Sequence, residues 1–327
     1  MTNSERFTKF LNNEKIDRLP MVEWAPWWEP TLENWYKEGL PRDIAPSQYF
    51  GHDSLVQFWI PLKEMGFPAP ESENGGVISD EEDYERIKPL LFTDHVLLQI
   101  EESIKNTVSN LKEEDIAYWY TFEGFFWFPR TLFGIEDHLY SFYDYPELLL
   151  EINKELCDFY KKVIDIIYKY FTPAFMTFAE DMSYNHGPML SKECYDTFLA
   201  PFYRQIVPLI KEKGTKVFID TDGFVEPMIP WFEEVGIEGC LPLERMAGVD
   251  VNRIRENHPE WLMLGGFDKT IMHKGEEAMR AEFERILPAM KSGRYLPSVD
   301  HQTPPDVSLE NYKIYMRLLN EYCRKAV

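Results

Sequence analysis

The chain has 327 residues, of which 44% are apolar and 15% aromatic, so it can bury a large core and is not expected to be disordered. Its 34 Lys and Arg residues stand against 56 Asp and Glu residues, and the formal net charge of −22 argues against nucleic acid or an anionic membrane as the main partner. No apolar run reaches the length of a membrane span, no signal-peptide pattern is evident, and four cysteines without C-x-x-C spacing indicate reduced thiols in a cytoplasmic protein.

Three short apolar runs predict strands in the N-terminal half of the chain. They are "LPMVEW" (residues 19–24), "DSLVQFW" (53–59) and "IAYWYTFE" (116–123). Between the second and the third lies a stretch rich in Pro, Gly and acidic residues, Gly66 to Glu85. We interpret it as part of a surface excursion around residues 61–90 rather than as a linker, because the sheet needs strands from both sides of it.

From about Pro173 onward, apolar strands alternate with amphipathic helices. The predicted strands are "AFMTFAED" (174–181), "KVFID" (216–220), "GCLPLE" (239–244), "WLMLGG" (261–266) and "RYLPSVDH" (294–301). Helices are predicted from Ser191 to Gly214, with kinks at Pro201 and Pro208, and over residues 225–235, 250–257, 276–290 and 308–322.

Counting both halves gives eight strands, which predicts one closed (β/α)₈ barrel, the TIM-barrel fold, as a single domain over residues 1–327. A doubly wound open sheet is the alternative. No G-x-G-x-x-G motif follows an early strand, so a dinucleotide-binding first half is not supported.

Nearly every predicted strand ends in a carboxylate, and in a barrel the carboxyl ends of the strands build the site. Asp220 and Asp222 alternate, so at most one should face the barrel axis unless the strand has already ended. Capping of the next helix is an alternative role for each acid; we expect it for Asp268, and the two roles are evenly balanced for Glu244. In chain order the strand-end residues are Glu23, Glu123, Glu180, Asp181, Asp220, Asp222, Glu244, Asp268, Asp300 and His301.

Asp300 and His301 are the strongest candidates for functional residues, because histidine titrates near neutral pH. His186 is a second candidate for a functional histidine. Such a set of acids and imidazole could bind a divalent metal, share protons in acid–base chemistry, or hold a cationic or hydroxylated ligand. The spacing does not choose among these three uses.

Aromatic residues are concentrated in two strand-to-loop segments, "VEWAPWWEP" and "YWYTFEGFFWFPRTLF". Core packing accounts for many of them. The remainder, including Trp24, Trp27, Trp28 and Trp127, could line a pocket for a flat ring.

The C-terminal half resembles the uroporphyrinogen decarboxylase superfamily. The stretches that carry the resemblance are "FAEDMSYNHGPMLSKECYDTFLAPFYRQIVPLIKEKG", "VFIDTDGFVEPMIPWFEEVGIEGCLPLE", "AGVDVNRIREN", "LMLGGFDKTIMHKG" and "YLPSVDHQTPPDVSLENYKIYM", with a weaker match in "FEGFFWFPRTLFGIEDHLYSFYDYPELL". The resemblance implies a (β/α)₈ barrel, in agreement with the strand count.

The resemblance leaves the activity open, because one fold hosts several chemistries. Porphyrinogen decarboxylases of the family carry an arginine-rich "RQAGR" segment after the first strand, whereas this chain has tryptophans and Glu29 there. Arginine forks are what a polycarboxylate requires. A porphyrinogen is therefore a poor substrate; a decarboxylase of a smaller carboxylate, which needs no metal, and a non-catalytic ligand-binding barrel stay open as alternatives.

The other branch that the resemblance implies is the corrinoid-linked methyltransferases. In its coenzyme M type, a His-x-Cys pair and a later Cys bind zinc; here those positions read Asp220 and Asp222, and Asp300–His301, so a harder oxygen and imidazole site is expected instead. Our leading hypothesis is removal of a methyl group from a small methoxylated aromatic substrate, with delivery to a corrinoid carried by a partner protein.

The hypothesis assigns roles to the residues named above. Catalysis is assigned to Asp181, Asp222, Asp300 and His301, and a divalent metal such as zinc to Asp222, Asp300 and His301. The predicted substrate-binding residues are Trp24, Trp27, Trp28, Glu123, Trp127, Glu180, His186 and Glu244. A homodimer could form through the aromatic C-terminal helix, although its stripe of Tyr312, Tyr315 and Tyr322 is expected to pack on the barrel.

Overall fold

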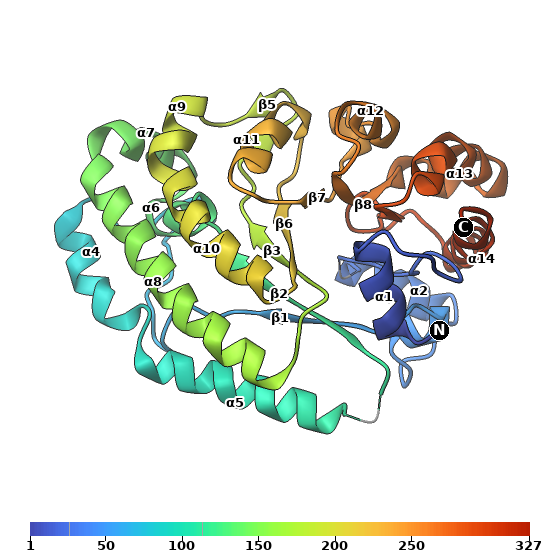
Figure 1. Ribbon diagram of the computed structural model, residues 1–327, viewed down its shortest axis with the longest axis horizontal. Coiled ribbons are helices and arrows are strands. Elements are labelled where there is room, and N and C mark those ends of the chain that lie inside the picture. The colour runs from blue at the N-terminus through green and yellow to red at the C-terminus, as the bar shows by residue number, and fades with distance from the viewer. Residues whose placement is uncertain (26, 113) are drawn as a thin grey trace.

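The computed structural model describes residues 1–25, 27–112 and 114–327, and its centre is a curled sheet of seven parallel strands (Figure 1). Each strand pairs with the next one along the chain in the order β1-β2-β3-β6-β7-β8-β9. The strands are β1 (Leu55–Trp59), β2 (Ala117–Glu123), β3 (Phe175–Ala179), β6 (Lys216–Asp220), β7 (Gly239–Leu241), β8 (Leu262–Phe267) and β9 (Tyr295–Val299). A separate hairpin joins β4 (Ser183–Tyr184) to β5 (Gly187–Pro188).

Every residue of β3, β8 and β9 is buried, on both faces of the sheet, whereas β1 at the edge leaves Gln57 and Trp59 exposed. This is the pattern of parallel strands covered by helices on one face and by the barrel interior on the other. The register pairs Glu123 with Ala179, Ala179 with Asp220, and Asp220 with Leu241. The carboxyl ends of β2, β3, β6 and β7 therefore reach one level, and the side chains that follow them are neighbours.

Helices cover the outer face of the sheet, with α5, α8 and α10 outside the first strands and α12, α13 and α14 beside the last ones (Figure 1). Two predicted helix starts are confirmed as side-chain caps: the hydroxyls of Ser191 and Ser308 accept from the N–H groups of Cys194 and Asn311. The helices are α1 (Asn3–Leu11), α2 (Glu29–Lys37), α3 (Pro46–Phe50), α4 (Glu81–Ile87), α5 (Asp94–Asn110), α6 (Trp127–Phe133), α7 (Ile135–Asp144), α8 (Pro146–Tyr170), α9 (Lys192–Cys194), α10 (Ala200–Glu212), α11 (Ile229–Glu234), α12 (Val251–Asn257), α13 (Glu276–Lys291) and α14 (Leu309–Lys325).

The predicted first strand, residues 19–24, is not a strand, and this corrects the count of eight. The segment is extended and largely buried, and it lies between the two edges of the sheet: the Trp24 indole donates to Val299 O of β9 at 3.0 Å, and Asp53 N, just before β1, donates to Met21 O at 2.8 Å. Full closure of an eight-stranded barrel is not observed. The doubly wound alternative is wrong as well, because the strand order has no switch point.

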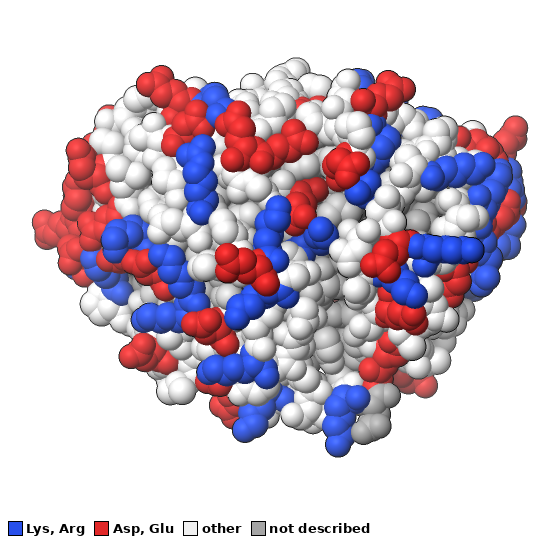
Figure 2. All heavy atoms as spheres, viewed as in Figure 1, with Lys and Arg blue, Asp and Glu red and all other residues white. Residues whose placement is uncertain are grey.

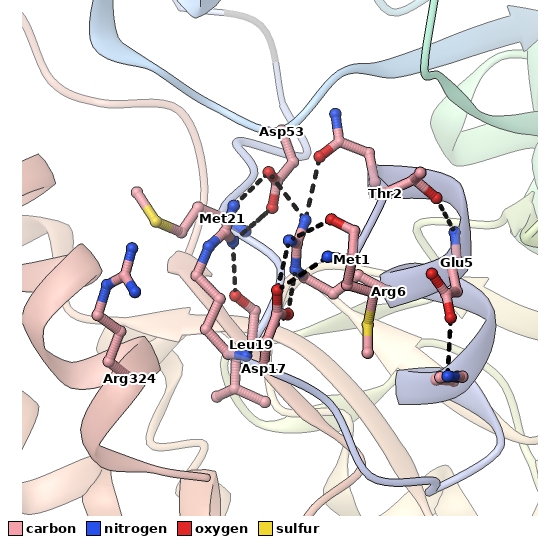
Figure 3. Close-up of polar contacts among 12 residues, drawn as sticks. Met1, Thr2, Glu5, Arg6, Asp17, Leu19, Met21, Asp53 and Arg324 are labelled. Atoms are coloured by element: carbon pink, nitrogen blue, oxygen red, sulfur yellow. Dashed lines mark hydrogen bonds and ion pairs between the residues drawn. The ribbon is translucent and has the colours of Figure 1, made fainter.

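An ionic network joins this segment to the start of β1 in place of ladder hydrogen bonds (Figure 3). The carboxylate of Asp53 accepts from both terminal nitrogens of Arg18, at 2.7 and 2.6 Å, and from Met21 N at 2.9 Å. Arg6, which also binds Asp17, approaches Asp53 at 3.5 Å. Arg6 and Asp53 are buried, so water cannot replace either partner at low cost.

The aromatic stripe of α14 packs inward, as the sequence led us to expect. The side chains of Tyr312, Tyr315 and Tyr322 are buried in the core, so they offer no surface to a second copy. All four cysteine side chains are buried as free thiols. The excursion after β1 packs against α6, where Val77 N donates to Leu132 O at 2.6 Å.

The surface carries both signs of charge. Figure 2 shows Lys and Arg side chains interspersed with Asp and Glu on the face in view, without one large basic patch. Within the described residues no helix combines the length and apolarity that crossing a membrane requires.

Candidate active site

A cavity of about 280 Å³ opens at the carboxyl ends of β1, β2, β3 and β6. Its position is where barrels of parallel strands place their sites, because the loops after the strands converge there. The lining residues are Trp24, Ala25, Trp59, Trp127, Ala179, Glu180, Asp181, Asp220, Asp222, His301 and Gln302. Three indole rings thus face four carboxyl groups and one imidazole.

Asp220 and Asp222 both reach the cavity, because β6 ends at Asp220 and the strict alternation of side chains ends with it. Within the described residues the Asp220 side chain forms no hydrogen bond or ion pair. Burial raises the pKa of Asp220 well above its usual range, and the neighbouring acids Asp222 and Asp181 raise it further.

Asp222 and His301 form a carboxyl–imidazole pair, with His301 Nε2 3.7 Å from Asp222 Oδ1. Burial raises the pKa of Asp222 to about 7, and the negative charges of Glu244 and Asp181 act in the same direction. Burial lowers the pKa of His301, and the positive charge of Lys269 adds to that effect. The raised pKa lets the Asp222 carboxyl hold a proton near neutral pH, and Trp24 packs edge-to-face against the neighbouring His301, at 5.9 Å between centroids.

Asp181 is turned toward the cavity by a backbone in the left-handed region, with φ of 42°. The Arg130 guanidinium donates to both the carbonyl and the carboxylate of Asp181 at 2.9 Å, and it also lies over the Trp127 ring at 5.0 Å. Burial raises the pKa of Asp181, and Arg130 opposes that rise. The charge of this carboxylate is thus already matched by a protein cation.

Glu180 lines the cavity, but its carboxylate serves the fold. It accepts from the backbone N–H groups of Phe125, Phe126 and Trp127 at 2.7, 2.7 and 3.0 Å, and from the Tyr203 hydroxyl. Burial raises the pKa of Glu180 to about 7, and these four donors oppose the rise. Glu180 therefore positions the start of α6, which carries Trp127 into the cavity wall.

Asp300 and Glu244 are held beneath the loops, outside the cavity lining. Asp300 is fully buried and accepts from the backbone N–H groups of Arg245 and Lys269 at 2.8 and 3.2 Å, while burial raises its pKa to about 7. Glu244 accepts from Gly223 N at 3.0 Å and from Lys269 Nζ at 3.3 Å.

The predicted metal set of Asp222, Asp300 and His301 is not brought together by this arrangement. Nowhere in residues 1–25, 27–112 and 114–327 do three or more His, Cys, Asp or Glu side chains form a group that could hold a metal ion. The residues present therefore do not fit the predicted zinc site, and Asp300 is the member that faces away. Asp268, as expected, caps a turn by accepting from Thr270 N at 2.8 Å.

Two of the four tryptophans predicted to bind substrate, Trp24 and Trp127, line the cavity, and two do not. Trp27 packs in a separate aromatic cluster with Trp35 and Tyr312, and Trp28, 44% exposed, precedes α2. Trp59 was missed, although it is the last residue of a predicted strand and that position alone could have indicated it.

The two other predicted ligand contacts also lie outside the lining. His186 is exposed at the turn of the β4–β5 hairpin, where its ring contacts Tyr184. Glu123 ends β2 with Oε2 buried and without a partner in the described part of the chain. Burial raises the pKa of Glu123, and Lys63 opposes this.

A model of the family described as uroporphyrinogen decarboxylase (URO-D) matches residues 43–322, so the chain belongs to that family. Among curated proteins, a uroporphyrinogen decarboxylase from Chloroherpeton thalassium is 26% identical over 138 residues, which cover 40% of this chain and 38% of that relative. The match thus spans well under half of the relative's length, and the activity of the relative does not carry over with the family.

Two solved structures have similar chain courses over most of their length. A "Putative Vitamin-B12 Independent Methionine Synthase" from Listeria monocytogenes is 12% identical with a TM-score of 0.47, covering 95% of this chain and 97% of that one. A β-glucosidase from Pyrococcus furiosus is 12% identical with a TM-score of 0.42, covering 97% of this chain and 88% of that one. At these scores we base no conclusion on either likeness.

Proposed function

We propose that this member of the family is a methyltransferase that removes the methyl group of a small methoxylated aromatic compound and passes it to a corrinoid carried by a partner protein. The observation that supports this most directly is the pairing of three indole rings with the Asp222–His301 pair in one small cavity. Flat rings pack against tryptophans, and a pair that holds a proton near neutral pH can deliver it to a departing oxygen.

In this proposal the tryptophans bind the substrate and the Asp222–His301 pair transfers the proton. Trp24, Trp59 and Trp127 hold the ring, and the Asp222–His301 pair protonates the phenolic oxygen as the bond between methyl carbon and oxygen breaks. The electron pair of that bond stays on the oxygen, so the product is the phenol. The corrinoid supplies the nucleophile that accepts the methyl group. No step requires the metal site, which the side chains do not assemble.

Decarboxylation of a porphyrinogen is less compatible with the cavity. A substrate with many carboxylates needs matching cations, yet the lining holds four carboxyl groups and neither Lys nor Arg. Arg130, whose guanidinium lies over the Trp127 ring, already binds Asp181. A cavity of about 280 Å³ also suits one ring better than four linked rings.

The test measures methyl transfer from methoxyarenes to free cob(I)alamin, followed by absorbance and by detection of the phenol. We expect turnover by the wild type, and a loss of about 10²–10⁴-fold in His301→Ala and in Asp222→Asn with unchanged circular dichroism. His95→Ala is the matched control, because His95 forms an exposed pair with Glu64 at 2.8 Å, away from the cavity. Full activity in both cavity variants, or carbon dioxide release from a carboxylated arene instead of methyl transfer, contradicts the proposal.

A further inference from the structure

Two of the four carboxyl groups in the cavity lining lack a Lys or Arg partner among the described residues. Glu180 has four hydrogen-bond donors and Asp181 has Arg130, but neither Asp220 nor Asp222 is in an ion pair with a Lys or Arg of the described residues. The nearby ammonium of Lys269 is directed to Glu244, at 3.3 Å, and to Asp300, at 4.0 Å. Two acids thus face the cavity without a partner of opposite charge.

The same cavity offers aromatic faces that suit a cation. Trp127 already lies against the Arg130 guanidinium, which shows this wall in a cation–π contact. Trp59, also in the lining, is 51% exposed, and Trp24 contacts His301. Indole faces next to unpaired carboxyl groups recognise an organic cation better than a neutral ring, because the quadrupole of the ring and the carboxylate attract the same charge.

We propose that the substrate of this cavity is a small aromatic ammonium ion, with its ring between the tryptophans and its positive group between Asp220 and Asp222. The inference rests on the proposed function only for the methoxy group; the preference for positive charge is a property of the cavity itself. A carboxylated arene would meet the same two acids without a Lys or Arg in the lining to balance its charge, so the charge of the substituent determines which methoxylated rings enter.

Binding of a cation should release protons. Asp220 and Asp222 are surrounded by Asp181, Glu244, Asp300, Lys269 and His301, and in the free protein burial and the neighbouring acids keep the pKa of both groups high. An ammonium ion between them favours their ionised forms and lowers both pKa values, so that the proton of the Asp222–His301 pair is then carried by His301. The affinity for the cation should therefore rise between pH 6 and pH 8, whereas the affinity for a neutral ring should change little.

Calorimetry with three matched ligands tests this: 4-methoxybenzylamine, 4-methoxybenzyl alcohol and 4-methoxybenzoate share ring and methoxy group and differ in charge. We expect the amine to bind at least about tenfold more tightly than the alcohol, and the benzoate most weakly. Asp220→Asn should remove most of the preference for the amine while changing the affinity for the alcohol by less than about twofold. Asp222→Asn serves as the second variant should Asp220→Asn not fold, and Asp94→Asn, an exposed acid on α5, is the control.

Equal or tighter binding of the benzoate, or an amine-to-alcohol ratio that survives both cavity substitutions, overturns the inference. The two proposals fail separately. Preferential binding of the amine without methyl transfer to cob(I)alamin contradicts the methyltransferase and leaves the cation site standing. Methyl transfer without any preference for the amine contradicts the cation site and leaves the methyltransferase standing.

Discussion

At the scale of single residues, Glu180 and Asp220 show that neighbouring carboxyl groups acquire different roles from their surroundings. The Glu180 carboxylate has four donors and leaves no capacity for a ligand, whereas the Asp220 carboxyl has none and stays available. Both residues lie at the ends of predicted strands, and both lie in the cavity lining. The number of donors around each group separates the positioning residue from the one that we propose to bind the ligand.

Gly124 provides a test of the positioning role. A Cβ at this position would overlap the Glu180 carboxylate, so Gly124→Ala should push Glu180 away from the N–H groups that begin α6. We expect a loss of about 1–3 kcal/mol in the free energy of unfolding by urea, because buried donors lose their acceptor, together with weaker ring binding through a displaced Trp127.

A double-mutant cycle distinguishes this cause from a general effect on the turn. In a Glu180→Ala background the added methyl group has room, so Gly124→Ala should cost clearly less there than in the wild type. Identical costs in the two backgrounds would show that Gly124 acts independently of Glu180.

At the scale of elements, the segment of residues 19–25 depends on one buried ionic junction. Asp53 joins Arg18, Arg6 and Met21 N where the sheet lacks an eighth strand. Asp53→Asn should lower the free energy of unfolding by about 3–5 kcal/mol, because it leaves the largely buried Arg18 guanidinium without a counter-charge, whereas Arg6 keeps Asp17.

The control for this variant is Glu33→Gln, which removes the partner of Arg42 from an exposed pair of similar geometry. It should cost no more than about 1 kcal/mol. Urea unfolding of both variants measures the contrast, and equal losses would mean that burial of the Asp53 junction contributes nothing.

The same segment shows where sequence reasoning stops. Apolar runs predicted all seven strands of the parallel sheet, though not the β4–β5 hairpin, and also the burial of Leu19, Met21 and Val22. The run at residues 19–24 has the same apolar pattern as the seven strands, because such a pattern indicates burial but not which backbone groups form hydrogen bonds. This segment is held instead by the ion pair between Arg18 and Asp53, which are far apart in the sequence and meet only in the folded chain.

In the site, the position of Asp222 and His301 after predicted parallel strands indicated that they lie near each other, because parallel strands align their carboxyl ends, and the structure places them 3.7 Å apart. They could not show that Asp300, one residue before His301, turns beneath the loops to accept from Arg245 N. Adjacent residues past a strand end point in directions that the local turn decides. For the same reason the sequence could not separate Trp24, in the cavity, from Trp27, in the core.

At the scale of the whole molecule, the fold keeps several carboxyl groups in sites that disfavour their charge. Burial is the largest cause in each case: it raises the pKa of Glu23, Glu180, Asp222 and Asp300 to about 7, and the pKa of Asp220 well above its usual range. In the unfolded chain these groups titrate near their ordinary values of about 4. The formal charge of −22 adds repulsion as they ionise.

The stability of the protein should therefore fall as the pH rises from about 5 to 8. Across this interval the folded state holds more protons at these groups than the unfolded state does, and stability declines with pH wherever that is so. We expect a lower midpoint of thermal unfolding at pH 8 than at pH 5, and a smaller difference in Asp222→Asn, which stays neutral throughout. Asp94→Asn, fully solvated, should retain the wild-type difference. A midpoint that rises with pH, or an unchanged difference in Asp222→Asn, would mean that these carboxyl groups are already ionised in the folded protein at pH 5 and that their sites favour the charge.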